Sequence, residues 1–504
     1  MLARLLELPL LLVLAGLGFV SMYLPAAHAL SVEAFFEARM FFYSGTLGLI
    51  FCVMVGLAFW SRRSPQDGLQ QLLALFGAFT LLPVALAVPF YEALRTTTFL
   101  NAYMEMVSSL TTTGASFFAP ERLSGTLHLW RAQVGWMGGL LIWVAAAAIL
   151  APLNLGGFEV TARAEPGEGD TRQVQTAQQD PTLRLRRSVR ALLPIYAALT
   201  LALWVILLIA GDTPLTALCH AMSLMATSGI SPEGGLGDTG SGIWGEVILF
   251  VFFVFALSRI TFSSDTVTGA GQTLFRDPEF RLGLLIVLGV PTALFLRHWV
   301  GAFELDETDD LQTALRAFWG ALFTTTSFLT TTGFVSMDWD TAQAWSGLPT
   351  PALILMGLAL VGGGVATTAG GVKLLRVFVL YLNGLREMER LVHPSSVSGS
   401  GAVKRRIRRQ GAYIAWIFFM LFALSLALIT VLLAGLGLGF QNALVLAVAS
   451  LSTTGPLMAV ATEPLVVLAD LGAWAKAVLA AAMVLGRLET LAIIALLSLN
   501  LWRN

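Results

Sequence analysis

The sequence predicts an all-α polytopic membrane protein, in which two N-terminal helices precede four helix–re-entrant pore loop–helix repeats around a central pore. The first observation is composition: of 504 residues, 56% are hydrophobic and 12% are charged, about half the charged share of a soluble domain. The second is a series of apolar runs of about 20 residues, each long enough to cross about 30 Å of hydrocarbon. The third is a Thr/Ser-Gly cluster that occurs four times between these runs.

The apolar runs predict ten membrane spans. They lie near residues 5–29, 39–60, 70–91, 128–151, 190–210, 241–258, 282–299, 346–382, 411–436 and 466–500. Basic connections at 61–68, 184–190 and 403–410 alternate with acidic ones at 303–310 and around Asp238 and Glu463. Connections rich in Lys and Arg stay on the cytoplasmic side. Because the number of spans is even, both termini are expected in the cytoplasm.

These spans divide the chain into six expected segments. They are two N-terminal helices (1–62), pore repeat 1 (63–152), a cytoplasmic linker (153–189), pore repeat 2 (190–281), pore repeat 3 with a broken second helix (282–410) and pore repeat 4 (411–504). The N-terminus contains an "AAHA" sequence typical of a signal-peptide cleavage site. Its apolar run, Leu5 to Leu24, exceeds the usual length of about 7–15 residues, so we interpret it as a retained helix. Cys52 and Cys219 give no disulfide or metal framework.

The four clusters read "SSLTTTGASFF", "LMATSGISP", "LTTTGFVSM" and "LSTTGPLMA". Each lies on the expected outer side, after a semi-apolar stretch too short to cross the membrane (98–110, 215–226, 311–329 and 440–451). The predicted ion-binding residues are Thr112, Thr113, Gly114, Thr227, Ser228, Gly229, Thr331, Thr332, Gly333, Thr453, Thr454 and Gly455. Irregular backbone at membrane depth is tolerated only where it is buried in protein or lines water.

Four such segments meeting on one axis would supply rings of backbone carbonyls that replace the hydration shell of an alkali cation. Glycine permits the positive φ that turns carbonyls toward the axis, and hydroxyls can add oxygen ligands. The negative C-terminal end of each short helix favours a cation. Ser, Thr and Gly also pack membrane helices together, but four clusters on the same side favour a cation selectivity filter.

A second feature interrupts the span at 346–382. The interruption, "GGGVATTAGG", contains the predicted gate residues Gly362, Gly363, Gly364, Thr367, Thr368, Gly370 and Gly371. Glycines there could simply permit a kink or close helix packing, but their number favours an unwound gate. Lys373 and Arg376 either anchor this segment or only mark the membrane interface.

Arg487 is predicted at mid-membrane in the last span, where ionisable groups are costly and usually functional. We interpret it as part of the gate, a positive barrier facing the pore. The alternative is a structural ion pair. Glu489 lies two residues on, roughly on the opposite helix face, so the two charges need not neutralise each other.

The four clusters, together with "WRAQVGWMGGLLIWV" (130–144), "GGGVATTAGGVKLLRV" (362–377) and "GRLE" (486–489), resemble the Trk/Ktr/HKT superfamily of potassium transporters over nearly the whole chain. The two extra N-terminal spans resemble the bacterial Trk-type pore-forming subunit. The second cluster departs from the family, because Ile230 follows its glycine where an aromatic is frequent. The gate reads "ATTAGG" where Ser-Thr-Gly-Gly-Gly is more common.

The resemblance implies potassium uptake in the bacterial inner (cell) membrane, with K⁺ as the transported ion, no covalently bound cofactor and no nucleic-acid partner. It implies a homodimer that binds a cytosolic regulatory subunit with nucleotide-binding domains. Intact filter glycines favour potassium over the sodium-permeable relatives, in which a serine replaces the first of them. Coupling to protons or sodium stays open. A polytopic membrane enzyme is disfavoured, because few carboxylates or histidines could converge on a site.

Overall fold

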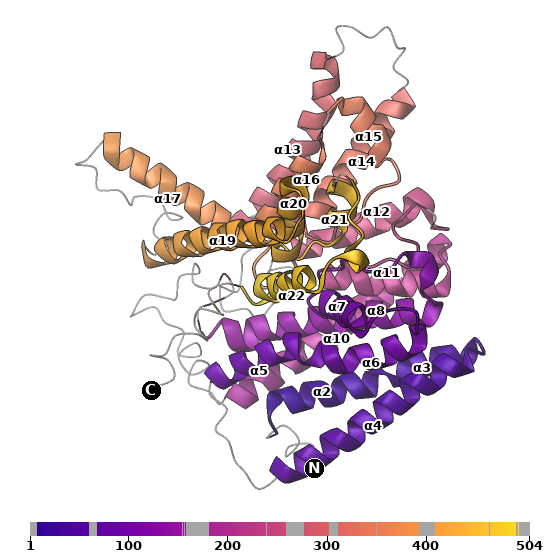
Figure 1. The fold of residues 1–504 in the computed structure, drawn as a ribbon. Helices are drawn as coiled ribbons and strands as arrows, with labels where there is room; N and C mark the ends of the chain where they lie inside the picture. Colours follow the sequence, from indigo (N-terminus) through magenta and orange to yellow (C-terminus); the bar gives the residue numbers. More distant parts are fainter. Residues whose placement is uncertain are drawn as a thin grey trace.

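The computed structural model describes residues 8–59, 68–153, 155, 157, 181–237, 239–258, 277–301, 311–348, 350–392, 409–462, 464–489 and 492. Most of the linker, the acidic segment 303–310, the basic segment 403–408, and Asp238 and Glu463 lie outside these residues. The first helices are α2 (Leu10–Ser21), α3 (Tyr23–Ser31) and α4 (Phe35–Phe59). Figure 1 shows them packed along one side of the molecule. Large apolar side chains such as Phe51 (63% exposed) point outward from α4, as expected of a surface that faces lipid.

Four groups of helices follow. The first consists of α5 (Gly68–Thr80), α6 (Leu82–Leu94), α7 (Phe99–Leu110), α8 (Gly125–Ala145) and the π-helical turn η2 (Ala146–Leu150). The second consists of α10 (Pro181–Ala210), α11 (Pro214–Ala226) and α12 (Gly242–Phe253). The third consists of α13 (Pro278–Gly301), α14 (Leu311–Leu329), α15 (Trp339–Ser346), α16 (Ala352–Val361) and α17 (Leu374–Val392). The fourth consists of α19 (Arg409–Gly435), α20 (Phe440–Leu451), α21 (Pro456–Ala461) and α22 (Ala473–Leu488).

Each Thr/Ser-Gly cluster directly follows one short helix: α7, α11, α14 or α20, which we call the cluster helices. Local sequence explains where two of them begin. The side chains of Thr98 and Thr213 accept hydrogen bonds from the backbone N–H of Asn101 (3.4 Å) and Thr216 (3.3 Å). These are N-caps, which satisfy donors that the first helical turn would leave free. Pro214 occupies the first turn of α11, where its missing N–H costs nothing.

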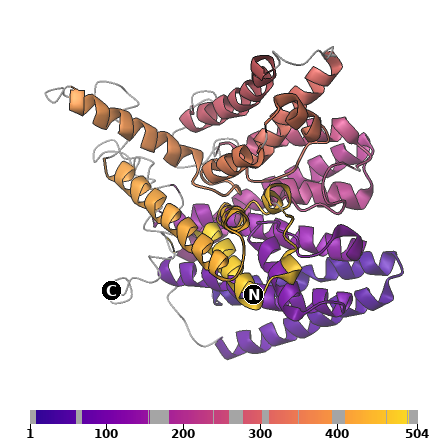
Figure 2. The same cartoon turned by 45° about the horizontal axis from the view of Figure 1, so that its top comes forward.

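The four groups pack in a closed order. One helix after the cluster of each group contacts the cluster helix of the next group: α8 packs on α11, α12 on α14, and α16 on α20. The fourth contact, of α22 with α7, joins the last group to the first. Figure 2 shows the groups following one another around the molecule in the order of their colours. This arrangement brings the C-terminal ends of the cluster helices toward a common centre.

The structure has fewer long spans than the sequence predicts. Within the described residues, seven helices are long and apolar enough to cross a membrane. Three expected spans are not among them. The span at 241–258 is shorter, since α12 ends at Phe253 and continues as a 3₁₀ turn. The span at 346–382 is broken between Val361 and Leu374, and α22 ends at Leu488, followed by Glu489 at φ 67°.

Candidate functional site

The four clusters share an uncommon backbone conformation. The threonine two residues before each cluster glycine has a left-handed φ: Thr112 at 54°, Thr227 at 51°, Thr331 at 58° and Thr453 at 54°. A β-branched residue rarely adopts this conformation, which costs about 1–3 kcal/mol where it occurs. Sequence reasoning assigned positive φ only to the glycines. Threonine recurs at this position in all four clusters, but because a β-branched residue disfavours positive φ, its identity carried no signal for the additional strain.

Hydrogen bonds at the ends of the cluster helices hold this conformation. The carbonyl of Ser108 accepts from the N–H of Thr113 (2.9 Å) and of Gly114 (3.2 Å). The carbonyl of Ser327 accepts in the same way from Thr332 (2.9 Å) and Gly333 (3.2 Å). The hydroxyls of Thr113 and Thr332 bond to hydroxyls two residues earlier, at 2.8 Å and 3.2 Å. These two side chains therefore brace the clusters, and their hydroxyl groups are already hydrogen-bonded within the clusters.

The cluster glycines bring successive clusters together. A Cβ atom on Gly114 would collide with the carbonyl oxygen of Ser228 in the second cluster, and one on Gly229 would collide with the carbonyl oxygen of Thr332 in the third. A Cβ on Gly333 would meet Pro456, directly after the fourth cluster, at 2.9 Å.

Gly455 completes this series. A Cβ on Gly455 would collide with the backbone of Gly114 and Ala115. The N–H of Gly455 also donates to the carbonyl of Thr113 at 2.6 Å. The four clusters therefore contact one another in the order first, second, third, fourth and first again, which closes a ring.

The expectation of positive φ is wrong for one glycine. Gly114, Gly229 and Gly333 have φ of 72°, 65° and 84°, whereas Gly455 has φ −58° because it begins α21. Helical φ suits any residue, so the requirement for glycine at 455 comes from the close approach of the first cluster and not from its own backbone. Pro456 in the first turn of α21 favours this helical start.

Buried oxygen atoms at the ring provide possible ligands for a cation. The hydroxyls of Thr112 and Thr453 are fully buried and have no hydrogen-bond partner in the described part of the chain. The corresponding hydroxyl of Thr331 accepts from Gly370, and that of Thr227 donates to the carbonyl of Ala226 at 2.7 Å. A buried hydroxyl without a partner costs free energy, so two of the four positions are suited to a ligand that is not protein.

The predicted gate, residues 362–371, lies directly against the ring and is called the gate segment below. The N–H of Gly370 donates to Thr331 Oγ1 at 2.7 Å. The hydroxyl of Thr368 donates to the carbonyl of Met225, at the end of α11, at 3.1 Å. A Cβ on Gly370 would collide with the carbonyl of Ser452. The gate segment thus contacts the second, third and fourth groups at the ends of their cluster helices.

Arg487 is held by the gate segment. Its side chain is 4% exposed, and its Nη1 donates to the carbonyl of Thr368 at 2.7 Å. Its Nε and Nη2 atoms have no partner among the described residues. Glu489 pairs instead with Arg376 at 2.6 Å. The structure therefore brings Arg487 and the gate segment together, and the described residues give Arg487 no carboxylate partner.

Lys373 and Arg376, which the sequence left undecided, have separate contacts. Lys373 Nζ donates to the carbonyl of Ala369 at 2.7 Å, so it binds the gate segment. Arg376 stacks over Phe418, 3.7 Å from the ring centre, besides its pair with Glu489. A cavity beside the gate segment is lined by Ala146 of η2, Gly370, Lys373 and Arg487, among others.

Sequence reasoning missed one further contact of the gate segment. Glu279, fully buried at the start of α13, accepts a hydrogen bond from the N–H of Val365 at 2.6 Å. The neighbouring N–H of Gly364 donates to the carbonyl of Ala256 at 2.9 Å. A carboxylate in the first turn of a helix is common for reasons of the helix dipole alone, so the sequence carried no signal for this role.

The chain is similar in sequence to proteins of known function. A family model described as a cation transport protein, TrkH, matches residues 244–502. The potassium uptake protein TrkH of Halomonas elongata is 31% identical and covers 90% of this chain and 86% of its own length. TrkH of Vibrio parahaemolyticus is 30% identical, with 80% of each chain covered, and TrkG of Escherichia coli K12 is 28% identical, with 97% of each covered.

The fold agrees with these matches. A crystal structure of the potassium transporter TrkH from Vibrio parahaemolyticus superimposes with a TM-score of 0.80 at 28% identity, over the full length of both chains. The predicted all-helical, multi-pass membrane fold and the resemblance to Trk-type transporters are both confirmed, and the family is one of transporters and not of enzymes. The chain belongs to the TrkH family of cation transport proteins.

Proposed function

We propose that this protein takes up potassium across the bacterial inner membrane through a selectivity filter formed by the four clusters. The observation that carries the proposal is the closed ring, in which each cluster glycine meets the next cluster and Gly455 donates to Thr113. The relatives named above are potassium uptake proteins, which agrees with this assignment. Backbone carbonyls around such an axis can replace the water shell of a potassium ion.

The cluster helices support the same assignment electrostatically. All four end at the ring, so their C-terminal ends, each with a partial negative charge of about half an elementary charge, point toward the ion path. Short helices ending near the membrane centre can therefore stabilise a cation without a carboxylate. In the described part of the chain, no group of three or more His, Cys, Asp or Glu residues could hold a metal ion.

The test is the reversal potential of the purified protein in a lipid bilayer with potassium on one side and sodium on the other. We expect a potential that favours potassium, because the four glycines keep the ring compact. Equal permeability to both ions would contradict the proposal and favour a sodium-permeable relative. A reversal potential that also moves with a proton gradient would show coupled transport.

The gate segment and Arg487 form the closed state in this proposal. Residues 362–371 contact the ring at Thr331 and Ser452, and Arg487 places a buried guanidinium on the carbonyl of Thr368. A fixed positive charge beside a narrow cation path raises the energy of a passing potassium ion, the more so at low dielectric. Opening would require the gate segment to leave its contacts with Met225 and Thr331.

We propose a homodimer with both termini in the cytoplasm, bound there by a regulatory subunit that carries nucleotide-binding domains. The basic segments Arg184–Arg190 and Lys404–Arg409 would form the docking surface. Part of the first segment already has a structural partner, since Arg184 Nε donates to the carbonyl of Ala148 at 2.6 Å. The second segment is therefore the better place to test docking.

Replacing Arg405, Arg406, Arg408 and Arg409 with glutamate should abolish co-purification of the regulatory subunit, because like charges would then repel at the interface. The control reverses Asp309 and Asp310 to lysine in the acidic segment on the other side of the membrane, which should leave co-purification intact. If the arginine variant is dimeric and still retains the subunit, these arginines only signal topology.

A further inference from the structure

One position on the cluster helices has a shared role that the filter assignment does not explain. Nine residues before each cluster glycine, the side chain is buried. The residues are Glu105, His220, Thr324 and Leu446, exposed by 1%, 0%, 0% and 0%. Three of the four are polar, although a fully buried site normally favours apolar residues. Each polar residue must therefore have a bonding partner.

The partners lie on the exit segments, which we define as the three residues after each cluster glycine: 115–117, 230–232, 334–336 and 456–458. Glu105 Oε2 accepts from the N–H of Phe117 at 2.7 Å. His220 Nε2 bonds to Ser231 Oγ at 2.9 Å. Thr324 Oγ1 accepts from the N–H of Ser336 at 3.2 Å. In three groups, the residue at this position thus links the cluster helix by a hydrogen bond to the backbone or a side chain of the exit segment.

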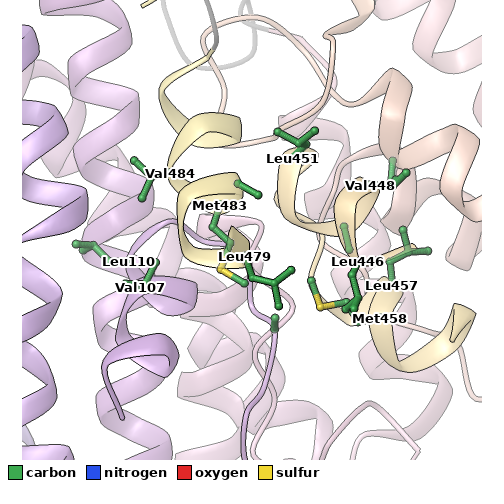
Figure 3. Packing of buried hydrophobic residues seen from close by; sticks show 14 of the residues in the cluster. Val107, Leu110, Leu446, Val448, Leu451, Leu457, Met458, Leu479, Met483 and Val484 are labelled. Atoms are coloured by element: carbon green, nitrogen blue, oxygen red, sulfur yellow. The ribbon is translucent and has the colours of Figure 1, made fainter. Parts of the chain in front are cut away.

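The fourth group shows why its residue is apolar. Its exit segment is helical, and the N–H groups of Leu457 and Met458 bond to the carbonyls of Thr454 (3.1 Å) and Gly455 (2.9 Å). With these donors satisfied, Leu446 lies beside Leu457 and Met458 in an apolar cluster (Figure 3). A polar residue occurs where the exit segment is irregular, and an apolar one where it is helical. The residue type at this position therefore depends on the conformation of the exit segment.

The first group carries a second attachment. Arg131 of α8 forms an ion pair with Glu105, with Nε and Oε1 2.5 Å apart, and both side chains are at most 3% exposed. Arg131 Nη2 also donates to Ser116 Oγ at 2.9 Å. Two consecutive residues after Gly114 are thus held from two helices. Removing one partner of such a buried pair leaves an uncompensated charge and is strongly destabilising locally.

In the third group, a carboxylate from another helix also binds the residues that follow the cluster. Glu246 of α12, 2% exposed, accepts from the N–H of Met337 at 2.6 Å and from Ser336 Oγ at 2.8 Å. Trp319 fixes the same carboxylate at 2.8 Å. Buried carboxylates therefore hold the exits of the first and third groups, which are not neighbours in the ring.

We infer that Glu105 and Arg131 are positioning residues that set the ion selectivity of the first quarter of the filter. The inference rests on the proposed function. The exit segment begins immediately after Gly114, so a displacement of Ser116 or Phe117 moves the carbonyls that face the ion. A less rigid ring can contract around the smaller sodium ion, so the discrimination between potassium and sodium falls. Because the pair bonds to the exit segment at Ser116 and Phe117 and not to the cluster itself, it acts through geometry.

The experiment measures the potassium/sodium permeability ratio from bi-ionic reversal potentials of purified, dimeric variants. Glu105→Gln keeps the shape of the side chain and removes its charge. We expect the ratio to fall about tenfold, which corresponds to one lost hydrogen bond to a charged group. Ser116→Ala removes the hydrogen bond from Arg131 and the one that Ser116 Oγ donates to the carbonyl of Phe118 (2.7 Å), and it should lower the ratio about threefold. Arg95→Gln, which breaks an exposed pair with Glu92, is the control and should leave the ratio unchanged.

The double variant Glu105→Gln with Arg131→Gln distinguishes an effect of the pair on the position of the filter backbone from an effect of its charge on the ion. If the pair acted through net charge near the pore, removing both charges would restore the ratio. Positioning predicts that the double variant is as impaired as Glu105→Gln. If Glu105→Gln fails to fold, Ser116→Ala decides the matter alone.

Measuring Gly114→Ser in parallel distinguishes a failure of the proposed filter from a failure of the positioning role of Glu105 and Arg131. If Gly114→Ser lowers the ratio while Glu105→Gln and Ser116→Ala keep it, the inference is wrong and the filter stands. If Gly114→Ser also keeps the ratio, the filter assignment falls and the inference falls with it.

Discussion

Replacing Gly114 with serine should reduce the potassium/sodium permeability ratio by about tenfold or more, with the protein still folded and dimeric. A loss of about 1.4 kcal/mol in differential binding already costs that factor. The added Cβ would collide with the carbonyl of Ser228, so the first and second clusters must move apart. It also adds strain, because Gly114 has φ 72°. The measurement is the bi-ionic reversal potential.

Two further glycines make this test specific. Gly347 has φ 59° and open space around it, so Gly347→Ser adds backbone strain alone and should leave the ratio unchanged. Gly455 has helical φ but a crowded Cβ position, so Gly455→Ser adds only a collision and should lower the ratio as Gly114→Ser does. A folded Gly114→Ser variant with full potassium selectivity would show that the first cluster does not line the filter.

Removing residues Ala366–Ala369 from the gate segment should raise basal potassium flux about tenfold or more without changing the potassium/sodium ratio. The deletion eliminates the bond of Thr368 to Met225 and the carbonyl that Arg487 binds. Each such contact contributes about 1 kcal/mol, so the closed state loses enough free energy to shift the population by that factor. Flux of a potassium isotope into proteoliposomes is the measurement.

Arg487→Gln tests the same gate with a smaller change. Glutamine keeps a donor for the carbonyl of Thr368 but removes the positive charge, so flux should rise while the gate segment stays in place. Lys476→Gln is the control. Lys476 is also a buried cation of α22, but its Nζ donates to the carbonyl of Ala469, away from the gate segment. Unchanged or reduced flux from folded forms of both gate variants would contradict the gate.

The sequence predicted the all-helical membrane fold because hydrophobic length is a direct physical requirement of the bilayer. It also identified the break after Val361, since consecutive glycines cannot sustain a helix cheaply. Seven of the ten expected spans are long helices in the described chain, and the other three are shortened or interrupted, because hydropathy registers apolar content and does not detect where a helix is interrupted. α22, for example, ends at Leu488 although apolar residues continue beyond it.

The candidate site was predictable only in part. Repetition revealed the four clusters, since a motif that occurs four times in equivalent places has a shared geometric task. The left-handed threonines, the helical φ of Gly455 and the partners of Glu105 and Arg487 depend on contacts between segments far apart in the chain. Such contacts leave no local pattern of spacing or propensity, so tertiary structure was needed to find them.

The closed packing order has a consequence for how the protein is made. Three seams between neighbouring groups join helices that leave the ribosome one after another. The fourth seam joins α22 to α7, and the bond from Gly455 to Thr113 lies beside it. Because domains assemble progressively during synthesis, three quarters of the ring can exist as an open arc, with the first cluster waiting at its free edge. The ring is closed on every side only when nearly the whole chain has entered the membrane.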